Sequence, residues 1–255
     1  MQNNLKTSSS NNHPVALITG AAVRIGAEIT RTLHQNNYNV IIHYRNSADA
    51  ANMLAKELND IRAESATTVG GNLSALTGVK DIAEKALEKW GHITLLVNNA
   101  SSFYATPFGS IEENQWDDLI NSNLKGPFFL SQALKNTLAT HNGSIINIVD
   151  IYSQNPLPKY APYSIAKAGV AMMTKALATE LGPNVRVNGI SPGVILAPSD
   201  NSQSQDEIDA LIAKTTLKTI GNPQDIASTV LFLAESASYI SGQILAVDGG
   251  RSVHV

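Results

Sequence analysis

The 255-residue sequence contains no cysteine, which excludes disulfides, thiolate metal sites and cysteine nucleophiles. Its six histidines are scattered without HxxxH or HExxH spacing, so a metal site built by the protein is not expected. No apolar run approaches the roughly 20 residues that a membrane-spanning helix needs. Basic residues do not dominate either: 18 against 21 acidic residues give a net charge of −3, which argues against a nucleic-acid partner.

The first thirteen residues also lack an apolar segment and are rich in Asn and Ser. They predict a disordered tail and not a signal peptide, with the cytoplasm as the expected location. Residues 14–255 are expected to form a single domain, because no linker divides them and a chain of this size buries a large core. The composition, 43% apolar and 15% charged, is typical of a globular protein.

Short apolar runs alternate with helical patterns along this domain. Strands are expected over residues 15–18, 39–44, 66–69, 93–97, 144–149, 185–190 and within 240–247. Helices are expected over residues 27–35, 48–59, 77–90, 112–125, 162–181, 206–218 and 224–233, the last with Pro223 at its first position. Seven strands that alternate with helices predict the α/β class and a Rossmann-like, doubly wound domain with a seven-stranded parallel sheet.

A glycine-containing turn, TGAAVRIG from Thr19 to Gly26, joins the first strand to the first helix. Gly20 allows a tight turn there, and Gly26 allows the helix and the strand to approach closely. Backbone N–H groups at the start of the helix would then face a pyrophosphate. The turn therefore predicts a dinucleotide site.

The end of the second strand indicates which dinucleotide binds. An acidic residue at this place takes the ribose 2′-OH of NAD, whereas a basic residue favours the 2′-phosphate of NADP. No carboxylate occurs here before Asp49, and Arg45 and Ser47, with Arg24 from the glycine turn, could hold a phosphate. We therefore expect NADPH as the cofactor. The segment reads His43, Tyr44, Arg45, Asn46, Ser47.

A candidate catalytic group lies in the second half of the chain. Tyr163 and Lys167 are four residues apart, which places them on one face of a helix, and an ammonium beside a phenol lowers the Tyr pKa from about 10. Asp150 follows the strand that precedes this helix, so all three side chains are expected over one crevice at the carboxyl ends of the strands. A Tyr so tuned acts as a proton donor or acceptor near neutral pH.

Taken in order, the motifs TGxxxxxG, NNA, an Asn in the next helix, YxxxK, a PG turn and a terminal DGG resemble the short-chain dehydrogenase/reductase family over residues 15–250. The resemblance implies that Tyr163 is the acid/base, that Lys167 contacts the nicotinamide ribose, and that Asn123 supports a proton-relay water. The cofactor-binding residues implied by motif and resemblance are Gly20, Arg24, Ile25, Gly26, His43, Tyr44, Arg45, Asn46, Ser47, Asn72, Leu73, Asn99, Ala100, Ser101, Tyr163, Lys167, Pro192 and Gly193.

Three departures from the usual family pattern point to one branch. Arg24 stands at the middle glycine of TGxxxGxG, Ser101 at the glycine after NNA, and Asp150 at the usual catalytic Ser. With these residues, TGAAVRIG, HYRNSA, NNASSFY and VD-x12-YSIAK are similar to the pteridine reductases, although Arg45 stands one position earlier than expected. The resemblance implies a pterin stacked between Phe103 and the nicotinamide, with Ser101 and Arg24 near its polar edge and Asp150 and Tyr163 at the reacting atoms.

The chemistry of Asp150 agrees with this branch. A carboxylate would repel the negative oxygen that forms when a ketone is reduced, whereas reduction of a ring C=N bond needs a proton on nitrogen, which a carboxyl group helps to supply. We expect NADPH-dependent reduction of a dihydropterin of the biopterin type, or of dihydrofolate. The alternatives are a carbonyl reductase acting on a 3-oxoacyl or similar ketone, and a non-catalytic NADPH-binding regulator.

The resemblance also implies a homotetramer, in which the C-terminal tail of a neighbour, residues 251–255, could reach the active site through Arg251 or His254. The segment 194–205, rich in Ser, Asn and Pro, is expected to be a mobile loop over the site. Its shape would decide between pterin and folate substrates.

Overall fold

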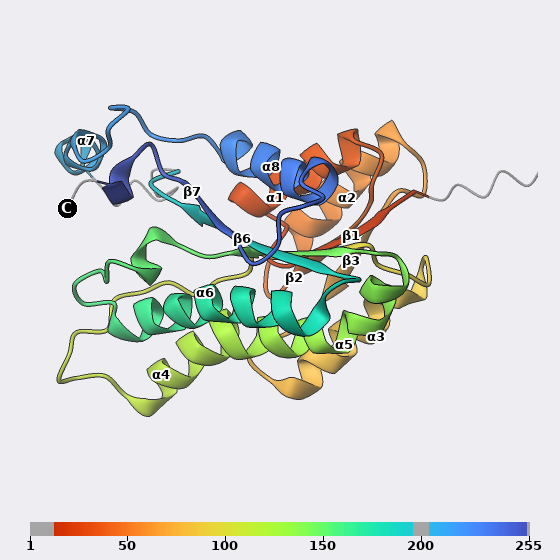
Figure 1. Cartoon of the computed structure of the whole chain (residues 1–255), viewed down its shortest axis with the longest axis horizontal. Coiled ribbons are helices and arrows are strands. Elements are labelled where there is room, and N and C mark those ends of the chain that lie inside the picture. The colour runs from red at the N-terminus through yellow and green to blue at the C-terminus, as the bar shows by residue number, and fades with distance from the viewer. Residues whose placement is uncertain (1–12, 196–203, 254–255) are drawn as a thin grey trace, which may run out of the picture.

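The computed structural model of the chain describes residues 13–195 and 204–253, and it has one parallel sheet between two layers of helices (Figure 1). The strand order is β3-β2-β1-β4-β5-β6-β7, and every neighbouring pair is parallel. This order confirms the predicted Rossmann-like, doubly wound domain with seven strands. The strands are β1 (Val15–Ile18), β2 (Asn39–Tyr44), β3 (Ala66–Gly70), β4 (Leu95–Asn98), β5 (Ser144–Ile148), β6 (Arg186–Pro192) and β7 (Ile244–Val247).

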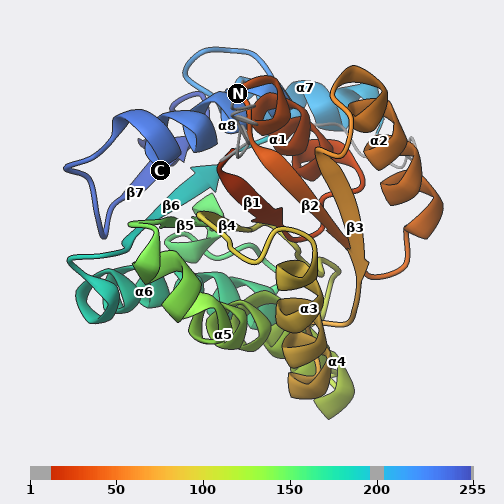
Figure 2. The same cartoon turned by 90° about the vertical axis from the view of Figure 1, so that its right-hand side faces the viewer.

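The helices divide between the two faces of the sheet, as Figure 2 shows, with α1, α2 and α8 on one face and α3, α5 and α6 on the other. Each face has its own apolar core, and the central strands contribute alternate side chains to both cores. The α-helices are α1 (Arg24–Gln35), α2 (Ala48–Ile61), α3 (Leu76–Glu88), α4 (Glu113–Ile120), α5 (Gly126–Thr140), α6 (Ala161–Leu181), α7 (Gln205–Ala213) and α8 (Pro223–Leu231).

Burial on both faces explains why a central strand such as β1 (VALI) is a continuous apolar run. All four side chains of β1 are buried, and so are all five of β5. Strands covered by helices on both faces carry no polar alternation, so they are recognised by length and by the turns that bound them. Strand β1 pairs with β2 and β4 at the centre of the sheet, which places the turn after β1 at the point where the strand order reverses.

Most predicted elements are confirmed to within a few residues, but three differences matter. Helix α5 was not predicted, and a π-helical segment, Asn121–Lys125, joins it to α4. Strand β6 continues through Pro192, where a turn was expected, and α7 ends at Ala213, five residues early. Most of the predicted mobile loop, the predicted tail apart from His13, and His254 lie outside the described residues.

Within those described residues, no helix is both long enough and apolar enough to cross a membrane.

Candidate active site

Residues at the ends of β2 and β4 contact the glycine turn that follows β1 and fix its position. Gly20 has φ of +61°, and a Cβ there would lie 2.9 Å from the Cα of Ala100. The Gly20 N–H donates to Nδ1 of His43 over 3.2 Å, and Nδ2 of Asn99 donates to the carbonyl oxygens of Thr19 (2.9 Å) and Gly20 (3.0 Å). The turn is therefore fixed in shape before any ligand reaches it.

His43, which is predicted to bind the cofactor, has its side chain buried against the glycine turn. Its side chain is 1% exposed, and the second ring nitrogen lies 3.2 Å from the carbonyl oxygen of Gly71. Burial lowers its pKa to about 4, so the ring is neutral and donates through Nε2 to Gly71. With both nitrogens engaged, the His43 side chain positions the glycine turn and offers no atom to a ligand.

The first turn of α1 is suited to an anion. Its N-cap residue, Val23, provides no side-chain cap, and the turn contains no acidic residue, so its N–H groups are left for another acceptor. Arg24 is exposed at this point with φ of +54°, a region that favours glycine, and Ile25 packs partly against the core. These features fit the pyrophosphate of a dinucleotide, as the sequence predicts.

Position 26 is the place in this turn with the least room for a side chain, so Gly26 is needed there. A Cβ at residue 26 would lie 2.2 Å from the Gly20 carbonyl oxygen and 2.7 Å from Nδ2 of Asn99. We expect Gly26→Ala to lower the melting temperature strongly and to abolish dinucleotide binding, because the obstacle is backbone that cannot move aside. Thermal unfolding with and without cofactor measures both effects. The control, Gly91→Ala, has φ of +72° but nothing within 4 Å, so it should cost only about 1 kcal/mol of strain and leave cofactor binding intact.

The end of β2 presents a polar rim without a carboxylate. Arg45, Asn46 and Ser47 are exposed and Tyr44 is half-buried. Nη1 of Arg45 lies 3.5 Å from Oδ1 of Asp118, an exposed ion pair that contributes little and leaves the guanidinium available to a phosphate.

Four predicted cofactor-binding positions further along the chain differ in burial and in their contacts. Asn72 is exposed, and its Oδ1 accepts the Ser74 N–H. Leu73 is 5% exposed and packs in the core, so its side chain does not face the crevice. Pro192 is buried in β6, and Gly193 donates its N–H to the Val247 carbonyl over 3.0 Å.

Asn123 links the end of β4 to α4. It lies in the π-helical segment, and its Nδ2 donates to the carbonyl oxygens of Ser102 (3.0 Å) and Leu119 (2.9 Å). Its Oδ1 accepts the hydroxyl of Ser101 over 2.5 Å. π-Helical segments are frequent at functional sites, and this one turns the Asn123 amide toward the loop that carries Ser101 and Phe103.

Asp150, which follows β5, and Tyr163 of α6 are in direct contact. The Tyr163 hydroxyl donates to Oδ2 of Asp150 over 2.5 Å, while Oδ1 accepts the Tyr152 N–H over 2.9 Å. Burial raises the pKa of Asp150 above its ordinary value, against the opposing effect of these hydrogen bonds. Burial, followed by the charge of Asp150, also raises the pKa of Tyr163. The prediction that Lys167 brings the Tyr163 pKa toward neutrality is therefore wrong for this arrangement, because burial and the neighbouring carboxylate outweigh the ammonium.

Lys167 lies on the same face of α6 as Tyr163, as predicted. Its Nζ donates to the carbonyl oxygen of Ile148 over 2.9 Å and lies 5.7 Å from the centre of the Tyr163 ring. The side chain is 3% exposed, and burial lowers its pKa to about 8. The ammonium is thus held at the floor of the crevice, where it counters the charge of Asp150.

Phe103 forms an aromatic wall that the sequence predicts only in part. Its ring stacks on Tyr160 at 4.6 Å between centroids and meets the Tyr163 ring edge-on at 4.8 Å. The side chain is 53% exposed, so one face remains open to a planar ligand. Tyr160 and Tyr152 were missed by the sequence analysis, although both flank the predicted catalytic residues.

Comparison with known proteins places the chain in a broad group of reductases. The family model described as enoyl-(acyl carrier protein) reductase matches residues 20–252. A 3-oxoacyl-(acyl-carrier-protein) reductase, FabG, of Staphylococcus epidermidis is 35% identical over 238 residues, covering 92% of this chain and 97% of the relative. Pteridine reductase 1 of Leishmania tarentolae is 34% identical over 280 residues, covering 94% and 96%. FabG of Thermotoga maritima is 34% identical over 246 residues, covering 92% and 96%.

Proposed function

The chain belongs to the short-chain dehydrogenase/reductase family, and from that premise we propose that it is an NADPH-dependent pteridine reductase. The substrate is a dihydropterin, which the enzyme reduces at a ring C=N bond to the tetrahydro form. The observation that carries this proposal is the 2.5 Å hydrogen bond from the Tyr163 hydroxyl to the carboxyl group of Asp150. It couples the proton donor of the site to a second, stronger acid.

The cofactor site in this proposal is built by the turn after β1 and by the ends of β2, β4 and β6. The uncapped first turn of α1 takes the pyrophosphate, and Arg45, Ser47 and Arg24 take the 2′-phosphate. Bound NADPH supplies a hydride to the substrate. Lys167 faces the ribose side of the crevice from α6, and Phe103 offers an exposed aromatic face to the pterin ring.

The proton follows a short path through the residues of the chain. The ring nitrogen of the substrate takes the proton of the Tyr163 hydroxyl as the electron pair of the C=N bond moves onto nitrogen. In this path Asp150 is protonated, so its carboxyl group donates to the Tyr163 oxygen across the 2.5 Å contact and leaves the Tyr163 hydroxyl proton for the substrate. The Tyr163 oxygen then takes the Asp150 proton, and water reprotonates Asp150. This path requires Asp150 to be neutral when the reaction begins, and burial promotes that by raising its pKa.

A second candidate is reduction of a 3-oxoacyl thioester, and the relatives favour it more than the first. FabG proteins of two organisms are as similar to the chain as the pteridine reductase is. Against it stands Asp150, because ketone reduction needs no second acid behind Tyr163, and whenever the Asp150 carboxyl group ionises its charge opposes the negative charge that develops on a ketone oxygen. A non-catalytic NADPH-binding role has less support, because Tyr163 and Lys167 are both present and lie together.

NADPH oxidation, followed by absorbance, tests these candidates. We would offer 7,8-dihydrobiopterin, 7,8-dihydrofolate and an acetoacetyl thioester of acyl carrier protein separately, at mildly acidic and at neutral pH. Turnover of a dihydropterin, fastest on the acidic side, is the expected result. Turnover of the thioester alone would replace the proposal with the second candidate.

A further inference from the structure

A cavity of about 650 Å³ lies beside the segment that directly follows Asp150. Three segments that lie far apart in the sequence line it: residues 151–158, the end of α7 with the turn that follows it (residues 213–218), and residues 251–252. Tyr152 belongs to this lining and also donates its N–H to Asp150, so one residue connects the cavity to the proposed reacting groups.

The lining of this cavity is cationic. Lys214, Lys218 and Arg251 contribute to it, whereas no Asp or Glu in the described part of the chain does. The two carboxyl groups closest in sequence to the lining are already engaged, Asp150 with Tyr152 and Tyr163, and Asp248 with the N–H groups of Gly250 (2.9 Å) and Ser252 (2.7 Å). The positive charge of the cavity is therefore not neutralised from within.

Arg251 is the best placed of the three cations. Its Nη2 donates to the Tyr152 hydroxyl over 3.2 Å, and the guanidinium lies 5.9 Å from the centre of the Tyr152 ring. These contacts hold the guanidinium in one orientation. Its Nη1 is buried and has no hydrogen-bond partner among residues 13–195 and 204–253. A buried donor without an acceptor is costly, so an acceptor that reached this nitrogen would be bound favourably.

We propose that this cavity is an anion-binding subsite for the tail of the substrate, in which Arg251, Lys214 and Lys218 hold a carboxylate or phosphate group. The inference rests on the proposed function and deepens it. It assigns to the enzyme a reduced pterin with an anionic tail, as in dihydrofolate, in preference to one with a neutral side chain, as in dihydrobiopterin. The pterin ring lies against Phe103, and the tail passes Tyr152 to reach the cations.

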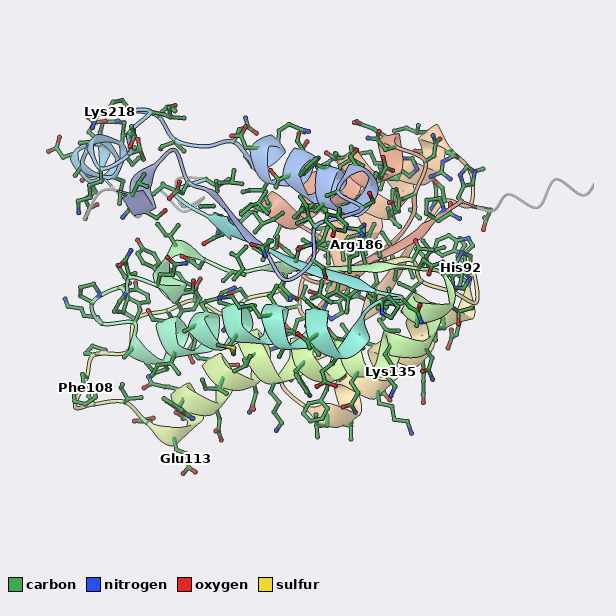
Figure 3. All side chains as sticks on the ribbon, in the orientation of Figure 1. His92, Phe108, Glu113, Lys135, Arg186 and Lys218 are labelled. Carbon is green, nitrogen blue, oxygen red and sulfur yellow. The ribbon has the colours of Figure 1, made fainter. Side chains whose placement is uncertain are left out.

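The substitution Arg251→Gln tests this subsite by removing the positive charge while keeping a polar side chain. We expect the ratio of kcat/KM for dihydrofolate to that for dihydrobiopterin to fall about tenfold, through a higher KM for dihydrofolate, since one charge-assisted hydrogen bond is lost. Lys135→Gln is the control, because Lys135 is an exposed cation on α5, at the opposite end of the molecule from Lys218 in Figure 3, and it should leave the ratio unchanged. Equal effects of Arg251→Gln on both substrates would overturn the inference, since they would indicate an action through Asp150 alone.

Binding of p-aminobenzoylglutamate, which has the anionic tail but no ring to reduce, separates this inference from the proposed function. Calorimetry with the NADPH-loaded enzyme should show binding that Arg251→Gln weakens and Lys135→Gln does not. If this binding occurs while neither dihydropterin is turned over, the subsite stands and the proposed function fails. If dihydropterins are turned over while the tail does not bind and the ratio is insensitive to Arg251, the subsite fails and the function stands.

Discussion

Replacing Asp150 with Asn is expected to lower kcat/KM for a dihydropterin by about a thousandfold, within the range that a positioned acid or base contributes. Asn has the shape of Asp, and its Oδ1 still accepts the Tyr152 N–H that holds the segment in place. The amide, however, is too weak an acid to transfer a proton to the Tyr163 oxygen. Steady-state kinetics should therefore show the loss in kcat, while fluorescence titration shows unchanged NADPH binding.

The pH profile gives this prediction a second, independent readout. The pKa of Asp150 is raised by burial, and the protonated form is the active one, so kcat/KM should be high on the acidic side and fall as pH rises through this raised value. In Asp150→Asn this decline should be absent. Asp117→Asn, an exposed carboxylate on α4, is the control and should keep both the rate and the profile. An Asp150→Asn variant with the native rate and profile would remove the basis of the proposed chemistry.

The elements that the sequence predicts well are those that local patterns determine. Strands β1 and β2 match their predicted bounds, because short apolar runs end at Gly20 and at the polar segment after Tyr44. Pro223 begins α8 as expected, where Asn222 accepts the Gln224 N–H and caps the helix. The crevice at the carboxyl ends of the strands follows from the parallel order of the sheet.

Helix α5 shows why local sequence patterns fail to predict some elements. Its first residues are Gly126 and Pro127, and in the sequence alone these two residue types indicate a turn or loop. In the structure, Pro127 occupies the first turn, where no N–H partner is needed. A Cβ on Gly126 would lie 2.5 Å from the Leu73 carbonyl oxygen, so the glycine serves a close approach between distant segments. Only the folded arrangement contains that information.

The pKa shifts of the site cannot be predicted from the sequence, for the same reason. The spacing of Tyr163 and Lys167 predicts their shared helix face correctly, but the direction of the Tyr163 pKa shift depends on burial and on Asp150, thirteen residues away. The cationic cavity likewise combines three segments, of which only the one that contains Arg251 carries a signal in the resemblance. Distances between such segments are set by the packing of the whole domain.

The second large effect is expected for Tyr163→Phe, which removes the hydroxyl that gives its proton to the substrate. We expect kcat to fall by about a hundredfold to ten-thousandfold, with little change in NADPH binding. The aromatic ring keeps its edge-on contact with Phe103, so the wall of the crevice should remain in place. Asp150 then loses its 2.5 Å donor and cannot reach the substrate through it.

The double variant Asp150→Asn/Tyr163→Phe tests whether the two side chains act in a single proton path. In the path proposed here, the proton of Asp150 reaches the substrate only through the Tyr163 oxygen. Once Tyr163 is gone, loss of the carboxyl group should cost little more, and the double variant should be about as slow as the slower single variant. Losses that multiply would mean that Asp150 and Tyr163 act on the substrate independently. The coupling free energy between the two substitutions therefore measures how much of the proton transfer depends on Asp150, the carboxyl group at the usual Ser position.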